Sequence, residues 1–268
     1  MKFTTKSASV LLAILAASTI GGTIASAADA KELESTGTVI VDGDGDTGGP
    51  DTDGKIPDPE KEDPTKPTDP ETVDPNPNKG PLKVELVSKL NFGKIAPKAG
   101  EIKTNAAPIK TEAGDRGALI QFADVRSDVY GYVLQAKMSQ QFTSGSNVLS
   151  GSTITYNNGI AKPETDNTNT PGSFVKSGDI VLGAGEDDKT FNSVEVFKAD
   201  AAKKEGKGRY TLEFGQSKDY QAPTGVIGTG TPDTADKAVQ LTIPNKTASN
   251  MAKGTYESKV TWSLVTAP

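Results

Sequence analysis

The sequence predicts an all-β fold, with a single antiparallel β-sandwich or barrel-like domain over residues 80–268. Two observations support this prediction. First, apolar and polar residues alternate in several short runs, and a period of two is typical of a strand that buries one face. Second, clusters of glycine, asparagine and proline separate these runs, as expected for strands joined by tight turns. A length of about 190 residues fits one domain of this kind.

Five runs keep their apolar side chains on one parity, so each run predicts a strand with a core-facing side. Their apolar residues are Leu82, Val84 and Leu86; Tyr132, Leu134, Ala136 and Met138; Tyr210, Leu212 and Phe214; Val239, Leu241 and Ile243; and Tyr256, Val260, Trp262 and Leu264. Turn-forming residues lie between the runs at 157–159, 171–172, 183–185 and 228–230. The only stretch that permits a helix is 199–204, which is long enough for a turn or two.

Residues 1–27 predict a secretory signal peptide. Lys2 and Lys6 give this segment a positive start, and residues 10–17 are apolar. Residues 25–27 then have the small-x-small pattern of a signal-peptidase site. The alternative is a transmembrane anchor, but the apolar run is shorter than the roughly 20 residues that span a bilayer. We therefore expect an exported chain with no membrane insertion after cleavage of the signal.

Residues 28–79 predict a disordered, acidic spacer that is rich in aspartate and proline. The segment contains 15 acidic residues and 5 lysines, a net charge of 5 − 15 = −10. Repeated Asp-Pro pairs favour extended backbone, like charges stretch the chain, and too little apolar surface is present to offset the entropy of folding. One short β-branched run, Thr36–Val41, either adds as a strand to a sheet edge or is an incidental apolar patch.

The residue types limit the chemistry that the chain can perform. The sequence has no cysteine and no histidine, so disulfides, a lipid-modified N-terminus, and most nucleophile–base pairs and zinc sites are excluded. Residues 80–268 carry 22 basic and 20 acidic residues, and this near-neutral balance without a basic cluster argues against nucleic acid as a partner.

Two acidic motifs remain as candidates for metal binding or catalysis. Glu186–Asp188 is interpreted as an acidic hairpin tip, with a calcium or paired-carboxylate site as the alternative. Asp42–Asp46 is similar to the start of an EF-hand loop, but Thr47 and Asp53 stand where that loop needs glycine and glutamate. We expect no cofactor, no metal site and no enzymatic activity. A glycosidase built on two carboxylates across a cleft is the enzymatic alternative.

A resemblance to a known family rests on an ordered series of segments. The C-terminal segments are 239–244, 253–256 and 260–264, the last of which contains Trp262-Ser263-Leu264. Together they resemble the end of WxL-domain proteins, which are surface proteins of low-GC Gram-positive bacteria. Similar upstream segments are 80–82, 90–93, 124–126, 131–134, 206–210 and 214–215. The chain departs from the family pattern at Tyr132-Val133-Leu134, where tyrosine replaces tryptophan, and at Tyr210, where an indole is also expected.

The resemblance implies noncovalent attachment to the cell wall, with peptidoglycan or another wall polymer as the ligand. It also implies other WxL-system surface proteins as partners, including membrane-anchored ones, and a role in adhesion or in surface complexes. No sorting motif of the Leu-Pro-x-Thr-Gly type and no second apolar stretch is present, so retention is expected to be noncovalent. The alternative is an adhesin or complex subunit whose main ligand is another surface or host protein.

Six residues are candidates for wall binding or for the family motif. They are Trp262, Leu264, Tyr132, Leu134, Tyr256 and Tyr210. Strand parity puts Trp262 and Leu264 on one face with Val260. That face is either the core side of the last strand, an exposed aromatic platform for sugar rings, or part of a groove for a protein. The hydroxyl of Tyr256 is expected to bond backbone at a strand corner, as in some β-sandwiches.

Overall fold

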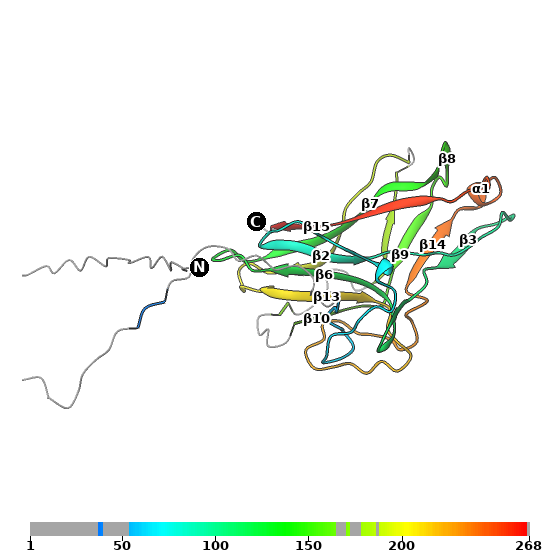
Figure 1. Cartoon of the computed structure of the whole chain (residues 1–268). Coiled ribbons are helices and arrows are strands. Elements are labelled where there is room, and N and C mark those ends of the chain that lie inside the picture. The colour runs from blue at the N-terminus through cyan, green and yellow to red at the C-terminus, as the bar shows by residue number, and fades with distance from the viewer. Residues whose placement is uncertain (1–36, 40–53, 165–169, 172–177, 186–187, 267–268) are drawn as a thin grey trace, which may run out of the picture. The chain divides into compact units, whose positions relative to one another are not determined.

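The computed structural model describes residues 37–39, 54–164, 170–171, 178–185 and 188–266 of the 268-residue chain (Figure 1). The chain divides into two compact units, residues 1–41 and 42–268, and the fold below is that of the second unit. The predicted signal peptide 1–27, the motif Asp42–Asp46 and the acidic residues 186–187 lie outside the described residues. No helix in the described ranges is long and apolar enough to cross a membrane.

The described residues form an all-β fold, as predicted. The strands are β1 (Val73–Pro75), β2 (Leu82–Ser88), β3 (Ile102–Asn105), β4 (Ile109–Thr111), β5 (Gly114–Arg116), β6 (Ala118–Asp124), β7 (Tyr132–Ser144), β8 (Asn147–Val148), β9 (Thr153–Tyr156), β10 (Gly159–Pro163), β11 (Ile180–Gly183), β12 (Val194–Ala199), β13 (Gly208–Phe214), β14 (Val239–Ile243) and β15 (Glu257–Thr266). The helical elements are η1 (Pro70–Thr72) and α1 (Asn245–Ala248). The stretch expected to be the only one to permit a helix, 199–204, instead ends β12 and forms a turn in which Lys204 has a positive φ of 55°, and the short helix α1 forms outside it.

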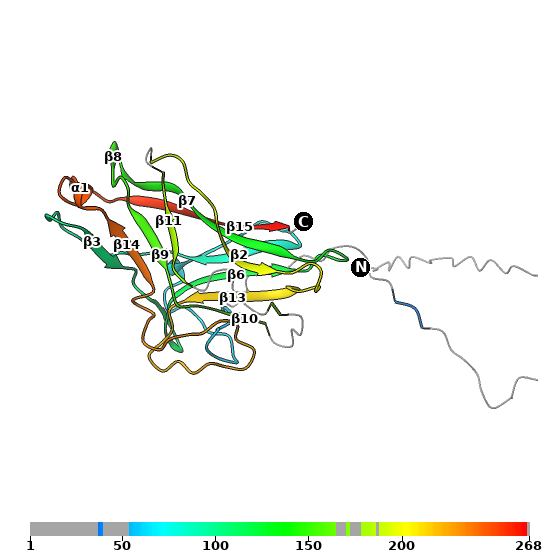
Figure 2. The ribbon, with the colours of Figure 1, turned by 180° about the vertical axis from the view of Figure 1, so that it is seen from behind.

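All strand pairs in the described part of the chain are antiparallel. One sheet has the order β1-β2-β6-β13-β10, a second has the order β11-β9-β14-β3, and a third has the order β12-β7-β15, with β8 added to β7. Strands β4 and β5 form a separate hairpin. Figures 1 and 2 show from both sides that β7 and β15 lie over the sheet that contains β2, β6 and β13. The main core fills the space between these layers.

The main core is built on aromatic rings from four strands, β6, β7, β12 and β13. The rings of Phe122 and Tyr210 are stacked, with centroids 5.7 Å apart, and Phe197 packs against both. Tyr132 meets the edge of Phe122 at 5.9 Å. Ring contacts of this kind add to the free energy gained by burying large apolar side chains. The strands predicted from Tyr132 and Tyr210 therefore face the core as expected.

A bulge in β2 changes the predicted parity of that strand. The pairing of β2 with β6 shifts register between Val84 and Leu86. Leu82 and Val84 pack on the main core, whereas Leu86 faces a second apolar cluster on the other side of the sheet. The prediction that these three residues share one face is therefore wrong at Leu86, since an extra residue in a strand reverses the alternation beyond it.

The second apolar cluster holds part of the predicted spacer. Ile56 is 2% exposed and packs with Leu86, Ile109 and Leu119. Strand β1 pairs with β2, from Val73 opposite Ser88 to Pro75 opposite Leu86. The prediction of a disordered spacer that ends at residue 79 is therefore wrong for residues 54–79. Proline-rich composition favours extended backbone, but extended backbone also fits the edge of a sheet.

A buried ionic cluster fixes the same segment. The Arg116 guanidinium, fully buried, donates to both carboxylate oxygens of Asp58, at 2.9 Å from Nε and 2.7 Å from Nη2. Its Nη1 lies 3.7 Å from Glu60, whose carboxylate accepts hydrogen bonds from the Ser217 backbone and hydroxyl. Burial, together with the negative charge of Glu60, raises the pKa of the Glu213 carboxyl well above its usual range. The Arg116 guanidinium thus pairs with Asp58 and Glu60, while the Glu213 carboxyl feels its charge and accepts a hydrogen bond of 3.1 Å from the Gly117 N–H.

Candidate functional site

Strand β15 is an edge strand with one open side. It pairs along its length with β7, from Glu257 opposite Thr143 to Thr266 opposite Tyr132, and the pairing is irregular between Glu257 and Val260. No other strand in the described residues pairs with β15. A row of backbone N–H and C=O groups along its second edge is therefore left without a strand partner, which is the usual condition of an edge strand.

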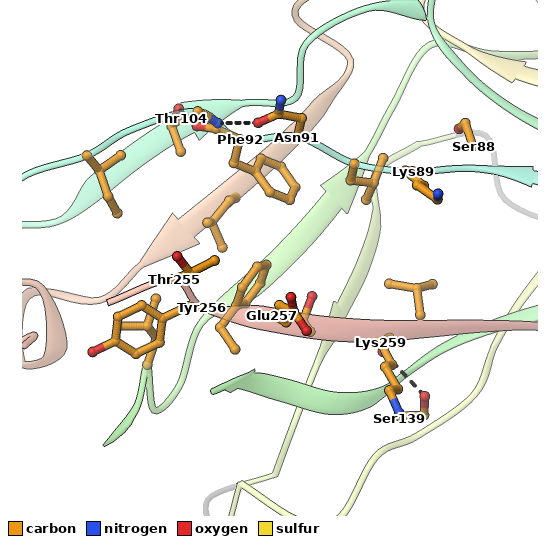
Figure 3. A pocket seen from close by; sticks show the side chains of 18 of the residues that line it. Ser88, Lys89, Asn91, Phe92, Thr104, Ser139, Thr255, Tyr256, Glu257 and Lys259 are labelled. Atoms are coloured by element: carbon orange, nitrogen blue, oxygen red, sulfur yellow. Dashed lines mark hydrogen bonds between the residues drawn. The ribbon is translucent and has the colours of Figure 1, made fainter. Parts of the chain in front are cut away.

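A groove with a volume of about 1210 Å³ runs along this open edge. One wall is formed by residues 253–262, which include the first part of β15. The opposite wall is formed by residues 87–95, the end of β2 and the connection after it. Figure 3 shows Asn91 and Phe92 on the second wall, across from Glu257 and Lys259 on β15. The floor is made by apolar residues of deeper elements, namely Phe142, Leu149, Tyr156 and Leu241.

Trp262 belongs both to the core and to the groove. Its ring meets Tyr156 edge-on, with centroids 5.7 Å apart and planes at 87°, and lies 6.1 Å from Phe214. The side chain is partly buried and packs on the main core, and it also lines the groove. Val260 and Leu264 pack on the same core, so the shared face predicted from strand parity is present.

Three candidate residues lie too deep to contact a ligand. Tyr132, Leu134 and Tyr210 are each 0% exposed. Their strands are interior, because β7 lies between β12 and β15 and β13 lies between β6 and β10. These three side chains therefore have no surface open to solvent in this fold. At Tyr132, the hydroxyl that replaces an indole donates a buried hydrogen bond of 3.0 Å to the Gly206 carbonyl oxygen.

Tyr256 stands at the entrance of β15 and lines the groove. Its hydroxyl donates to the Ala252 carbonyl oxygen at 2.9 Å, which is the backbone hydrogen bond expected at a strand corner. This bond fixes the ring beside the groove. Leu264, in contrast, packs on the core and is not among the groove-lining residues.

The wall opposite β15 contains groove residues that periodicity did not single out. Phe92 packs edge-on against Phe142, with centroids 5.9 Å apart, and its carbonyl oxygen accepts a hydrogen bond of 3.2 Å from Thr104. The side chain of Asn91 accepts a bond from the Gly93 N–H at 2.9 Å, which caps the turn. The segment 90–93 had been noted only as part of the family resemblance, because an irregular connection has no alternating pattern.

The charged residues along the groove are mostly basic. Four lysines and two acids line it: Lys89, Lys94, Lys253, Lys259, Asp74 and Glu257, a balance of 4 − 2 = +2. Lys89 is paired with Asp74 at 3.1 Å. Nowhere in the described ranges do three or more acidic side chains gather in a way that would hold a metal ion. An apolar floor, an open strand edge and basic rims are features of a binding surface.

Comparison with protein families identifies the chain. Residues 28–268 match the family model described as WxL domain surface cell wall-binding. The chain belongs to the WxL family. No curated protein and no solved structure shows a match to it. The WxL match covers the groove and both of its walls, and it places the protein at the cell surface, on the cell wall. It also assigns the chain to a family that binds rather than catalyses.

Proposed function

We propose that this WxL protein is secreted and held noncovalently on peptidoglycan by its C-terminal β domain. It acts there as a non-catalytic binding or structural component of a complex with other surface proteins, including membrane-anchored ones. The family match supports wall binding. The part that concerns peptidoglycan and partner proteins goes beyond that match.

The observation that carries the proposal is the open groove along β15. It brings together Trp262 and Tyr256, the two predicted site residues that reach a concave surface. Concave sites with an apolar lining and a few polar groups are where proteins commonly bind ligands. Leu264 supports this strand from the core side. The wall polymer is therefore assigned to the groove.

Sedimentation of the secreted protein with washed peptidoglycan sacculi tests the proposal. The wild-type protein is expected to pellet with the sacculi, and Trp262→Ala is expected to remain in the supernatant. Val265→Ala is the matched control, because Val265 lies on the same strand, is 45% exposed and is not among the groove-lining residues. Melting temperatures of both variants separate loss of binding from loss of fold. A folded wild-type protein that does not pellet would contradict the proposal.

A second candidate function has one observation in its favour. An open strand edge is also a site at which another protein can add a strand, so the main ligand of β15 would then be a surface or host protein. Pull-down from cell-surface extracts, with and without muramidase digestion of the wall, distinguishes the two. Capture that survives complete digestion of the wall favours the protein ligand.

A further inference from the structure

We propose that the groove recognises the peptide stems of peptidoglycan, which add as an extended strand to the open edge of β15, and does not recognise the sugar rings. This inference rests on the proposed function and specifies which part of the polymer is bound. It follows from the state of the aromatic rings, the open strand edge, the charge of the rims and the shape of the floor.

The groove aromatics are poorly placed to stack on sugars. A stacking platform needs a free ring face, but the Trp262 ring is engaged by Tyr156 and Phe214 and is partly buried in the core. Phe92 is likewise held by its edge-on contact with Phe142. These rings present a limited apolar surface to the groove, and such a surface suits a flat, narrow chain better than a sugar ring.

The strand edge offers what a peptide backbone needs. An added strand forms main-chain hydrogen bonds to the N–H and C=O groups of an open edge, and these bonds supply much of its affinity. Strand β15 is 10 residues long. A stem of about five residues reaches ~17 Å when extended, which is about half the length of a strand of this size. The edge is therefore long enough for one stem.

The charge of the groove suits the carboxylates of a stem peptide. Lys94 and Lys253 stand on opposite walls, at residues 87–95 and 253–262, and both are exposed. Neither forms an ion pair with the residues that the structure describes. Stem peptides carry free carboxylates along their length and at their ends, whereas the glycan backbone is much less charged. Hydrogen bonds between charged groups are stronger than neutral ones.

The D-residues of stem peptides, which alternate with L-residues over part of the stem, also fit the apolar floor. In an extended chain of L-residues the side chains point alternately to the two faces. When L- and D-residues alternate, all side chains lie on one face, and the other face is bare backbone. Where L- and D-residues alternate in the stem, that bare face can lie on the apolar floor of Phe142, Leu149, Tyr156 and Leu241 while one backbone edge pairs with β15.

Sedimentation with two forms of the wall tests the inference. The secreted full chain is mixed with intact sacculi and with beads that carry glycan strands from which an amidase has removed the stems. Binding to the stripped glycan is expected to be at least about tenfold weaker, because the main-chain hydrogen bonds and the charge-assisted contacts of the stem are lost together. Equal binding to both forms overturns the inference but leaves the proposed function standing. No binding to intact sacculi overturns both.

Soluble peptides identify the occupant of the groove. A synthetic stem pentapeptide is expected to displace the protein from sacculi, and an all-L analogue of the same composition is expected to be about tenfold less effective. A peptide that copies residues 36–46 of this chain is the third competitor. If that peptide competed better than the stem, the occupant would be another protein strand and the inference would fail.

Paired charge variants test the rims. The double variant Lys94→Glu, Lys253→Glu is expected to weaken binding to intact sacculi about tenfold or more and to reduce its dependence on salt. Lys246→Glu is the matched control, because Lys246 is exposed on α1 and is not among the groove-lining residues. If the double variant and the control bind sacculi equally well, and both keep the wild-type melting temperature, Lys94 and Lys253 do not take part in binding.

Discussion

Arg116 lies fully buried between the Asp/Pro-rich segment and the five-stranded sheet, and Arg116→Met tests how strongly that segment is attached. Methionine has a similar length, so the change removes the charge and the two hydrogen bonds to Asp58 without opening a large cavity. It leaves three carboxyl groups, those of Asp58, Glu60 and Glu213, buried without a guanidinium. Breaking a buried pair in this way costs about 3–5 kcal/mol.

A loss of this size is a large share of the total stability of a domain, which is about 5–15 kcal/mol. Urea unfolding, followed by the fluorescence of Trp262, the only tryptophan, measures it at neutral pH. Tryptic cleavage after Lys61 reports release of the segment and is expected to become faster in the variant. Adding Asp58→Asn to Arg116→Met should restore part of the stability, because an unpaired charge is then removed.

Lys110→Met is the control for this experiment. Lys110 forms an ion pair of 2.6 Å with Asp115, opposite it in the β4–β5 hairpin, but both side chains are largely exposed. Exposed pairs contribute ~0.2–1 kcal/mol, so this variant is expected to differ little from the wild type. If Arg116→Met lost no more stability than Lys110→Met, and its tryptic cleavage were unchanged, Arg116 would not hold the Asp/Pro-rich segment on the domain. The prediction of a detached spacer would then stand.

Three further variants test the buried polar groups and the tight packing. The pKa of Glu213 is raised in the folded protein, so as pH rises above ~4.3 this carboxyl ionises first in the unfolded chain and the wild type loses stability. Glutamine does not titrate, so Glu213→Gln should become more stable relative to the wild type between about pH 4 and pH 7. A difference in unfolding free energy between the two proteins that stays constant with pH would contradict this. Tyr132→Phe removes the hydrogen bond to Gly206 and should lower the free energy of unfolding by about 1 kcal/mol in urea titrations. Gly117→Ala would place a Cβ 1.9 Å from the Phe214 carbonyl oxygen, so we expect a loss of about 3 kcal/mol, seen as a lower melting temperature.

Alternating hydrophobicity located the long strands of this protein, because a half-buried strand must repeat every two residues. The strands around Tyr132, Tyr210 and Trp262 follow that rule over most of their length, with an irregular start in β15. It failed at Leu86, where a bulge reverses the alternation without any change in composition. It also failed at 54–79, since no local pattern reveals that Asp58 meets a guanidinium 58 positions away along the chain.

The candidate site was predictable only on one wall. The C-terminal motif pointed to Trp262 and Tyr256, but the opposing residues 87–95 form an irregular connection whose position depends on where β2 and β3 are placed. The motif also pointed to Tyr132 and Tyr210, which strand pairing places in interior positions. Whether an aromatic residue on a strand faces a ligand or a core depends on the neighbours of that strand, and these are set by tertiary pairing.

The two apolar residues of the Trp-x-Leu motif contribute differently to folding and to binding. Both pack on the main core, but only Trp262 lines the groove. Leu264→Ala should therefore lower the free energy of unfolding by about 2 kcal/mol, which is at the low end for a leucine because this side chain is only partly buried. The variant should bind the wall as the wild type does at temperatures where it is folded. Trp262→Ala should reduce both quantities. If Leu264→Ala lost wall binding while still folded, the motif would act on the ligand through the shape of β15 as a whole, and the groove contact of Trp262 would not be the reason for its effect.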